Sequence, residues 1–210
     1  MQKLFFQKGI SLALYSFLTF IFFVLFDFEL LAYITFFVTV FILFSYRKLE
    51  LPLQKEASDE LLAPVSGKVF SIKPSDDPSF AYEVIIESGI FDNATLIVPT
   101  DVTLQECKLV HGTRLEVSSS LFQKLNENLC IIFEKEDIKI KIEHFAKRSL
   151  FGMECFISSK QDQLKAGEIY GYGFNCRTVV FIPNGMELQI KLDQKLQAGQ
   201  HTLGYFSKKS

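Results

Sequence analysis

The sequence lacks two features that would point to common classes of function. No Cys-x-x-Cys pair occurs among the four cysteines, so the sequence does not predict a zinc site. The formal net charge is −2, so there is no basic excess to indicate a nucleic acid as partner. The cysteines recur at similar intervals in strand-like segments and are predicted to be buried free thiols in a reducing compartment. They are Cys107, Cys130, Cys155 and Cys176.

Charge is also missing from two long stretches near the N-terminus. Residues 9–26 and 30–46 carry no charged side chain and consist mostly of Leu, Ile, Phe and Val. A bilayer core needs about 20 apolar residues per helix, so each stretch with its flanks predicts a membrane-spanning helix. Asp27 and Glu29 lie between the stretches, and carboxylates are costly in mid-bilayer, so this segment is expected to be a turn. The sequence therefore predicts a transmembrane helical hairpin over residues 1–48.

Basic residues flank this hairpin on both sides. Lys3 and Lys8 precede the first stretch, and Arg47 and Lys48 follow the second. Because positive flanks stay cytoplasmic, we expect a two-pass protein of the cell (inner) membrane, with both termini and the following domain in the cytoplasm. A cleaved signal peptide would need small residues after the first stretch, which are absent there. A soluble helical hairpin would need a polar face, and neither stretch has one.

The remainder of the chain has the pattern of a mostly-β domain. Residues 49–62 are polar and are interpreted as a linker along the membrane surface, so the domain is expected over residues 63–210. Short runs with period two and many β-branched residues follow, separated by turn signals such as Pro74–Pro78 and Pro183–Gly185. Residues 118–125 are expected to be a short helix or a mobile loop. The period-two runs include residues 68–72, 82–86, 130–133, 138–142 and 178–182.

A weak internal repeat occurs near the end of the chain. The segment 165–171, Lys-Ala-Gly-Glu-Ile-Tyr-Gly, is echoed by 197–204, Gln-Ala-Gly-Gln-His-Thr-Leu-Gly. Each has a turn glycine, a short strand and a second glycine, and together with the strand entry at Ala63–Val69 they resemble the β-sandwich of biotinyl- and lipoyl-carrier domains. Those carriers modify a Lys at a hairpin tip. No such Lys is found here, so no cofactor carriage is expected.

Taken together, the segments resemble the short, membrane-anchored form of the phosphatidylserine decarboxylase family. After the hairpin, that family has an aromatic and basic exit, here Phe44–Lys48, and then Ser-Pro-Ala-Asp-Gly-Lys-Val, here Ala63-Pro-Val-Ser-Gly-Lys-Val69. Its Phe-Asp-Val-His-x-Asn-Arg-x-Pro corresponds to Phe91-Asp-Asn-Ala-Thr-Leu-Ile-Val-Pro99. The remaining matches are Asn126–Asn128 to Asn-Glu-Arg-Asn, Ala146–Arg148 to Ala-Arg-Arg, and Phe174–Pro183 to a Phe-Gly-Ser-Arg strand ending in Pro.

The resemblance implies a self-processing, pyruvoyl-dependent carboxy-lyase of phospholipid biosynthesis. In the family, a Ser after a Gly attacks the preceding carbonyl, the chain is cleaved, and a pyruvoyl group remains as the electron sink for decarboxylation. The Ser needs a base, and the base needs an orienting carboxylate. On this chain the Asp position is Ser66, the His position is Ala94, and the Gly-Ser pair is Asn175-Cys176. The family Asn and Arg that follow the His are replaced by Leu96 and Ile97.

Cys176 is the remaining candidate catalytic residue. A thiolate is a good nucleophile and a cysteine can also eliminate, so cleavage after Asn175 is chemically possible and would be the one source of a pyruvoyl group. Ala94, however, supplies no base, and Asn175 has a Cβ where Gly leaves the backbone free. The three histidines, His111, His144 and His201, are expected to be surface or turn residues. The catalytic machinery is therefore predicted to be degenerate.

Three functions remain open from the sequence. The first is a decarboxylase acting in phosphatidylethanolamine synthesis. The second is a non-catalytic relative that binds an aminophospholipid headgroup or a partner protein at the membrane. The third is a barrel-sandwich adaptor of an export system, which the positive-inside charges and the absence of long soluble helices disfavour. No metal site is predicted.

Overall fold

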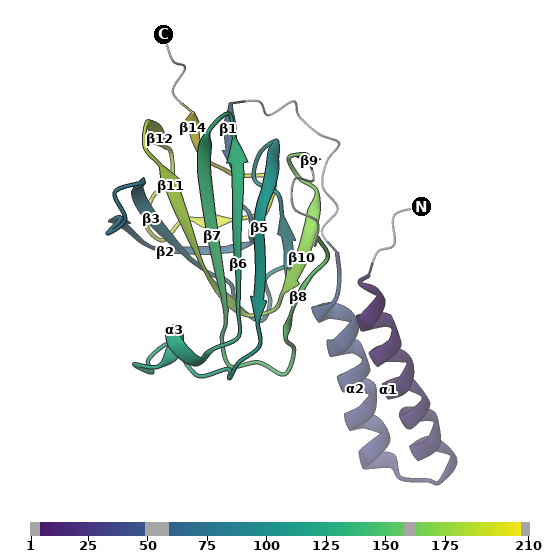
Figure 1. The fold of residues 1–210 in the computed structure, drawn as a ribbon. Helices are drawn as coiled ribbons and strands as arrows, with labels where there is room; N and C mark the ends of the chain where they lie inside the picture. Colours follow the sequence, from purple (N-terminus) through teal and green to yellow (C-terminus); the bar gives the residue numbers. More distant parts are fainter. Residues whose placement is uncertain (1–4, 49–58, 158–162, 207–210) are drawn as a thin grey trace. The chain divides into compact units, whose positions relative to one another are not determined.

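The structure, a computed structural model, describes residues 5–48, 59–157 and 163–206. Two compact units divide the chain, Met1–Glu50 and Leu51–Ser210 (Figure 1). The first consists of helices and the second is mostly β-structure, as the hydrophobic patterns predict.

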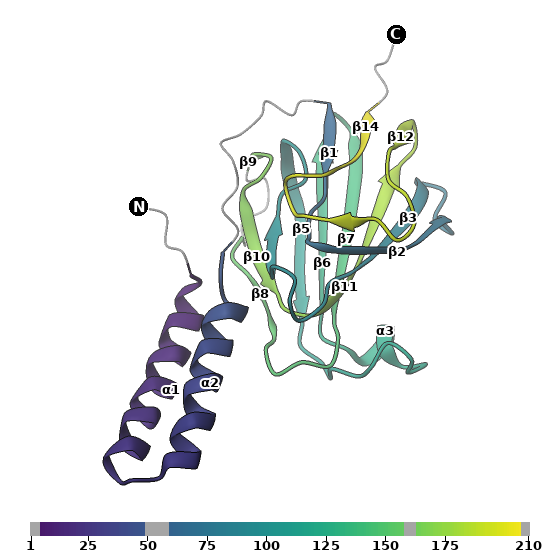
Figure 2. The same ribbon diagram turned by 180° about the vertical axis from the view of Figure 1, so that it is seen from behind.

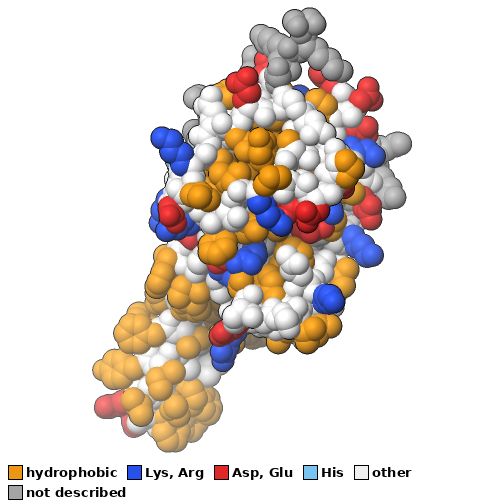
Figure 3. All heavy atoms as spheres, turned by 90° about the vertical axis from the view of Figure 1, so that its left-hand side faces the viewer, with side chains coloured by type: hydrophobic (Ala, Val, Ile, Leu, Met, Phe, Trp, Pro, Cys, Tyr) orange, Lys and Arg blue, Asp and Glu red, His pale blue; other side chains and the backbone are white. Residues whose placement is uncertain are grey.

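Two antiparallel helices, α1 (Gln7–Leu25) and α2 (Glu29–Ser45), form the first unit. The turn between them contains Asp27, whose φ of 58° is left-handed. The helices pack through small and polar residues, since the Thr39 hydroxyl donates to Ser16 Oγ at 2.8 Å. Most of their large apolar side chains face outward, and hydrophobic side chains are numerous on the visible face of this unit (Figure 3). By length and composition α1 is able to cross a membrane, whereas α2, with 17 residues, is shorter.

Three antiparallel sheets make up the β unit (Figures 1 and 2). The largest has eight strands in the order β13-β2-β3-β11-β7-β6-β5-β9, and the two smaller sheets have the orders β1-β14-β12 and β4-β10-β8. The strands of the large sheet are β13 (Lys195–Leu196), β2 (Gly67–Pro74), β3 (Phe80–Glu87), β11 (Cys176–Pro183), β7 (Ile138–Ala146), β6 (Asn128–Lys135), β5 (Val102–Val110) and β9 (Gln163–Leu164). The small sheets contain β1 (Glu60–Leu62), β14 (Thr202–Phe206), β12 (Met186–Leu188), β4 (Thr95–Ile97), β10 (Ile169–Gly173) and β8 (Met153–Cys155).

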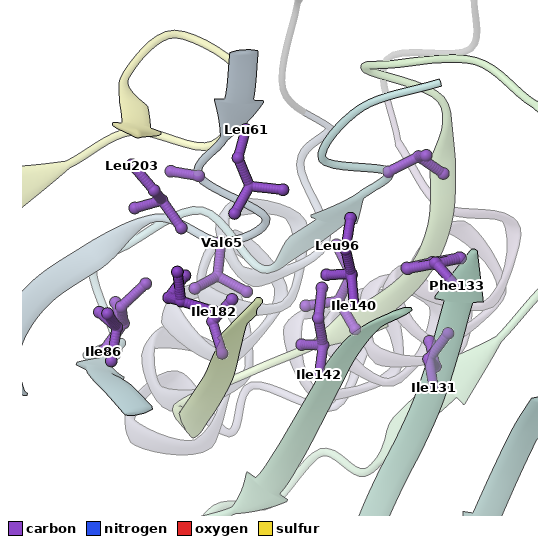
Figure 4. Close-up of a cluster of buried hydrophobic side chains, with 14 of the residues drawn as sticks. Leu61, Val65, Ile86, Leu96, Ile131, Phe133, Ile140, Ile142, Ile182 and Leu203 are labelled. Atoms are coloured by element: carbon purple, nitrogen blue, oxygen red, sulfur yellow. The ribbon is translucent and has the colours of Figure 1, made fainter. Parts of the chain in front are cut away.

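The main core lies between one face of the large sheet and the two small sheets. Alternate residues of β3, β11, β7 and β6 point into it, as period-two patterning requires. They meet side chains from β1, β4 and β14, among them Leu61, Leu96 and Leu203 (Figure 4). The opposite face of the large sheet carries a separate aromatic cluster, formed by Phe80, Phe122, Phe145, Val179 and Phe181.

The register places two kinds of connection at opposite ends of the large sheet. Arg177 pairs with Glu87, Cys176 with Ala146, and Asn128 with Val110, so the adjoining connections share one end. We call this the loop end, and it comprises residues 88–94, 111–127, 147–152 and 174–175. The other end, which we call the turn end, has tight connections at residues 75–79, 136–137 and 184–185. The short helix α3 (Phe122–Leu125) belongs to the loop end.

The two segments of the sequence repeat make matching hydrogen bonds. The turn glycines Gly167 and Gly199 both have positive φ, at 81° and 69°. Gly167 N–H donates to the Val98 carbonyl at 2.8 Å, and Gly199 N–H donates to the Ala63 carbonyl at 3.0 Å. The two acceptors each precede a proline, so the strand entry at Ala63-Pro64 has a counterpart at Val98-Pro99 that the sequence reading missed.

Three local predictions can be compared with the structure. β1 lies within residues 49–62, so the last residues of the expected linker belong to the β unit, while residues 49–58 lie outside the described part of the chain. Residues 118–125 contain α3, which is the helical alternative. All four cysteines are free thiols in strands, but only Cys176 is fully buried, whereas Cys107, Cys130 and Cys155 are partly exposed.

Candidate active site

The Asn175–Cys176 peptide lies at the loop end, where β11 begins. Asn175 has φ 50°, a left-handed conformation that asparagine tolerates better than most residues. Its Nδ2 donates to the Arg148 carbonyl at 2.9 Å, and its own carbonyl accepts the Lys147 N–H at 3.0 Å. Asn175 therefore adopts, despite its Cβ, a backbone conformation that glycine favours.

The thiol of Cys176 points into the interior and has no exposed surface. Its Sγ lies 3.5 Å from the Gly173 carbonyl, 3.7 Å from Thr178 Oγ1 and 3.9 Å from Ser88 Oγ. Burial raises the pKa of this thiol, and hydrogen bonds with Thr178 and Ser88 offset that rise only in part. Cys176 is therefore a neutral thiol at pH 7, which is a weak nucleophile.

Ser66 and Ala94 each contact a residue that itself lies beside the Cys176 thiol. The Ser66 carbonyl accepts the Ser88 hydroxyl at 2.6 Å, and Ser88 is one of the three neighbours of Cys176. The Ala94 carbonyl accepts the N–H of Gly173, whose own carbonyl is the nearest neighbour of the thiol. The structure therefore brings Ser66, Ala94 and Cys176 around one buried point, although they are far apart in the sequence.

Neither position supplies a group that could move a proton. Ala94 has only a methyl group, and it is buried. The Ser66 hydroxyl accepts the N–H of Ala198 at 3.1 Å, just as the carboxylate of Asp101 accepts the N–H of Ala166 at 2.8 Å in the matching segment. Ser66 thus fixes the turn before Gly199 and does not orient a base.

Comparison of the sequence with known proteins assigns the chain to a family. The sequence model of the family described as phosphatidylserine decarboxylase matches residues 38–204. This chain belongs to the phosphatidylserine decarboxylase family.

Two curated relatives agree with that membership. A phosphatidylserine decarboxylase proenzyme of Geobacter metallireducens is 26% identical over 173 residues, covering 79% of this chain and 78% of the relative. One from Geobacter sulfurreducens is 24% identical over 172 residues, covering 80% and 78%. No solved structure matches the chain. Membership of the decarboxylase family links the chain to phospholipid biosynthesis.

His144 is a buried residue near the thiol that the sequence reading assigned wrongly. It lies on β7 with no exposed surface, whereas it was expected at the surface or in a turn. Its Nδ1 lies 2.8 Å from Thr178 Oγ1 and its Nε2 lies 2.7 Å from the Tyr170 hydroxyl. The alternation of Ile140, Ile142 and His144 on one face of the strand was the signal that could have placed it inside.

The chemistry of His144 does not replace the missing base of the decarboxylase family. Burial lowers its pKa to about 3, so the ring is neutral at pH 7 and a weak base. It approaches Cys176 only through Thr178, and its two nitrogens are both occupied by hydroxyl groups. The exposed His111 and His201 lie in connections, as expected, and His201 Nδ1 accepts the Gln197 N–H at 3.0 Å.

A charged cluster lies beside the same peptide. Glu87 accepts hydrogen bonds from Arg177 Nε at 3.0 Å and from Lys147 Nζ at 3.2 Å. Burial would raise the pKa of Glu87, but the bonds and charges of Arg177 and Lys147 outweigh it and hold the pKa below its ordinary value. Two mostly buried cations thus share one carboxylate next to the Asn175–Cys176 peptide.

The residues present do not fit the pyruvoyl group of decarboxylase family members. Forming that group requires a base at Ala94 and a reactive hydroxyl or thiolate at residue 176, and neither is present. Among the described residues no cluster of three His, Cys, Asp or Glu side chains could hold a metal. A polar hollow lined by Lys73, Glu83, Glu143 and Phe181 opens on the opposite face of the large sheet, so it gives no access to the Cys176 thiol.

Proposed function

We propose that this chain is a membrane-anchored, catalytically degenerate member of the phosphatidylserine decarboxylase family that remains a single intact polypeptide. The observation that supports the proposal is the surroundings of Cys176, where the positions aligned by resemblance with the family's Asp and His, Ser66 and Ala94, offer no side chain that could deprotonate the thiol. The thiol is neutral, Ala94 is a methyl group, and Ser66 holds a backbone turn. A reactive nucleophile, a base and a carboxylate that orients the base are therefore all absent from these three positions.

The intact mass of the purified protein tests this proposal directly. We expect one species at 24.1 kDa. Two fragments that meet at Asn175 and Cys176 would contradict it, and the variant Cys176→Ala would then show whether the thiol makes the cut. As a matched positive control, the quadruple variant Ser66→Asp, Ala94→His, Asn175→Gly and Cys176→Ser restores the family residues at these four positions. Cleavage of this variant alone would locate the defect in those positions.

We also propose that the helical unit is a transmembrane hairpin. Its support is the uncharged length of both helices, their outward apolar side chains and the Asp27–Glu29 turn, which would lie at the far surface of the bilayer. By the positive-inside rule, Lys8 and Arg47 hold both ends in the cytoplasm. Protease treatment of intact and opened membrane vesicles tests the orientation, since a β unit digested only from the periplasmic side would contradict it.

In this view the β domain acts by binding, and its partner is an aminophospholipid headgroup or another protein of the same membrane. Support comes from family membership and from the intact fold around a site that lacks its chemistry. The matching hydrogen bonds at Gly167 and Gly199 also support a biotinyl/lipoyl-like repeat within the sandwich. Native mass spectrometry of the full chain in nanodiscs that contain phosphatidylserine or phosphatidylethanolamine tests the lipid version. If the protein carries no lipid from nanodiscs of any composition, binding to a lipid headgroup is refuted and binding to another protein remains.

A further inference from the structure

The loop end of the β unit exposes large apolar side chains at the tips of three separate connections. Leu150 is 85% exposed and Phe91 is 72% exposed, and both lie in loops beside the Asn175–Cys176 peptide. Leu121 and Leu125 are about half exposed on and beside α3, and Ile90 precedes Phe91. Side chains of this kind are spread singly over most soluble proteins, so their concentration at one end of one sheet requires an explanation.

Cations accompany these apolar tips. Lys124 lies between Leu121 and Leu125, and Arg148 precedes Leu150 by two residues; both side chains are exposed. The acidic residues of this end are occupied, since Glu116 pairs with Arg148, Glu127 with Arg114 and Asp92 with Lys195. The loop-end connections hold four basic and three acidic side chains, so this end combines apolar tips with a small excess of positive charge, which suits a surface that lies in the headgroup region of an anionic bilayer.

The turn end of the same sheet has the opposite character. Its three connections contain four acidic side chains and no basic one, namely Asp76, Asp77, Glu136 and Asp137, and all four are exposed. None of the exposed large apolar side chains of the described residues lies in these turns. The two ends therefore differ in both charge and hydrophobicity, and an anionic lipid surface would attract one end and repel the other.

We infer that the loop end is a lipid-contacting surface, with Phe91, Leu121 and Leu150 inserted among the headgroups of an anionic bilayer. This inference rests on the proposed membrane anchor, which keeps the β domain close to a bilayer and makes weak loop insertion effective. It goes beyond that anchor because it fixes which end of the domain touches lipid. The contact places the Asn175–Cys176 peptide and the Glu87 cluster at the membrane side of the domain.

The absence of tryptophan from the chain allows a direct test. In the full-length protein in nanodiscs, the single tryptophan of Leu150→Trp reports on the loop end and that of Tyr82→Trp reports on β3 near the turn end, where Tyr82 is 40% exposed. With brominated acyl chains we expect loss of fluorescence for Leu150→Trp, greater when the bilayer contains phosphatidylglycerol, and no loss for Tyr82→Trp.

A third reporter separates failure of this inference from failure of the anchor. Phe37→Trp places the probe on the exposed side of α2. If Phe37→Trp is quenched and Leu150→Trp is not, the anchor stands and the loop-end surface is overturned. If Phe37→Trp is not quenched, the anchor itself is wrong. Emission of Leu150→Trp that shifts to shorter wavelength without quenching would mean that protein, including a second copy, covers this end instead of lipid.

Discussion

The loop end and the turn end of the large sheet differ in the length of their connections and in the polarity of the interior beneath them. At the turn end, tight turns close the strands and the interior beneath them is hydrocarbon, with Phe133, Ile140 and Ile182 fully buried. At the loop end, long connections cover an interior that contains a thiol, an imidazole and several hydroxyl groups. Buried polar groups reduce stability unless each is hydrogen-bonded, so the loop end retains a costly arrangement that packing alone does not require.

The two ends also differ in the residues that they hold. The loop end and the strand termini beside it hold the charged Glu87 cluster, the apolar tips and the three positions that the resemblance aligns with the family's processing site. The turn end holds none of these. Four predictions test this comparison, beginning with the largest expected effect.

Replacing the buried histidine should cause the largest loss of stability. The substitution His144→Ala removes the ring that both Tyr170 and Thr178 bond to, leaves Thr178 with only the Cys176 thiol at 3.7 Å, and creates a cavity, so we expect a loss of about 3–5 kcal/mol in the free energy of unfolding. Urea denaturation of the full chain in detergent, followed by circular dichroism, measures it. The turn-end control Asn184→Ala, which removes one exposed hydrogen bond to Pro78, should change the free energy by less than about 1 kcal/mol. Equal effects at the two ends would refute the comparison.

Acid should destabilise the loop end through the same residue. The pKa of His144 is lowered to about 3 in the folded state, so the unfolded chain binds more protons below the ordinary pKa near 6.5. Stability contributed by neutral His144 is therefore fully present above about pH 6.5 and is lost as the pH falls toward 3, with a loss of about 2 kcal/mol at pH 5.

The variant His144→Gln isolates this pH effect. Glutamine can donate and accept hydrogen bonds but does not titrate. Its free energy of unfolding should fall less steeply between pH 6.5 and pH 5 than that of the unmodified chain. An identical slope in both proteins would show that other groups govern acid unfolding.

Removing a carboxylate should have unequal consequences at the two ends. Glu87→Gln leaves Arg177 and Lys147, whose side chains are only 14% and 15% exposed, without their shared anion, so we expect a loss of about 1–2 kcal/mol. Glu83→Gln near the turn end removes the ion pair with Lys73, which is about half exposed, while an amide oxygen can still accept the Ser75 hydroxyl, so it should cost less than about 1 kcal/mol. Thermal unfolding at low and moderate salt compares the two variants. A larger effect for Glu83→Gln would contradict the expected order.

The smallest effect is expected in the turn of β6 and β7. Asp137 has φ 69°, a conformation that glycine adopts without strain, so Asp137→Gly should raise the free energy of unfolding by about 0.5 kcal/mol or leave it unchanged. Denaturant midpoints of the two proteins provide the measurement. A clear loss of stability would mean that the Asp137 side chain has a structural role at the turn end.

Much of the local structure could be predicted from the sequence. The five period-two runs all lie within strands, namely β2, β3, β6, β7 and β11, because alternation directly reflects one buried face. The uncharged stretches form α1 and α2, and the acidic segment between them contains the turn. Family motifs also identified Ser66, Ala94 and Cys176 before their proximity was known.

Other features depended on contacts between distant segments. His144 was misplaced because its partners, Thr178 and Tyr170, lie on β11 and β10, and no local pattern links these strands. The matching prolines at Ala63-Pro64 and Val98-Pro99 differ in sequence, and only their hydrogen bonds to Gly199 and Gly167 relate them. β1 was interpreted as linker because three residues carry too little periodicity to stand out.

The sequence by itself determined which segments are apolar helices, which are strands and which family positions are altered, because each of these features depends on residues that are adjacent in the sequence. Only the tertiary structure decided that the altered positions meet around a neutral thiol, that a histidine is buried beside it, and that the apolar loop tips share one end of the sheet. Antiparallel register brings together residues that are far apart in the sequence, as with Ser66 and Cys176, which are 110 positions apart and both contact Ser88, and burial then raises the pKa of the thiol. Neither the register nor the burial can be read from the composition of the segments that meet.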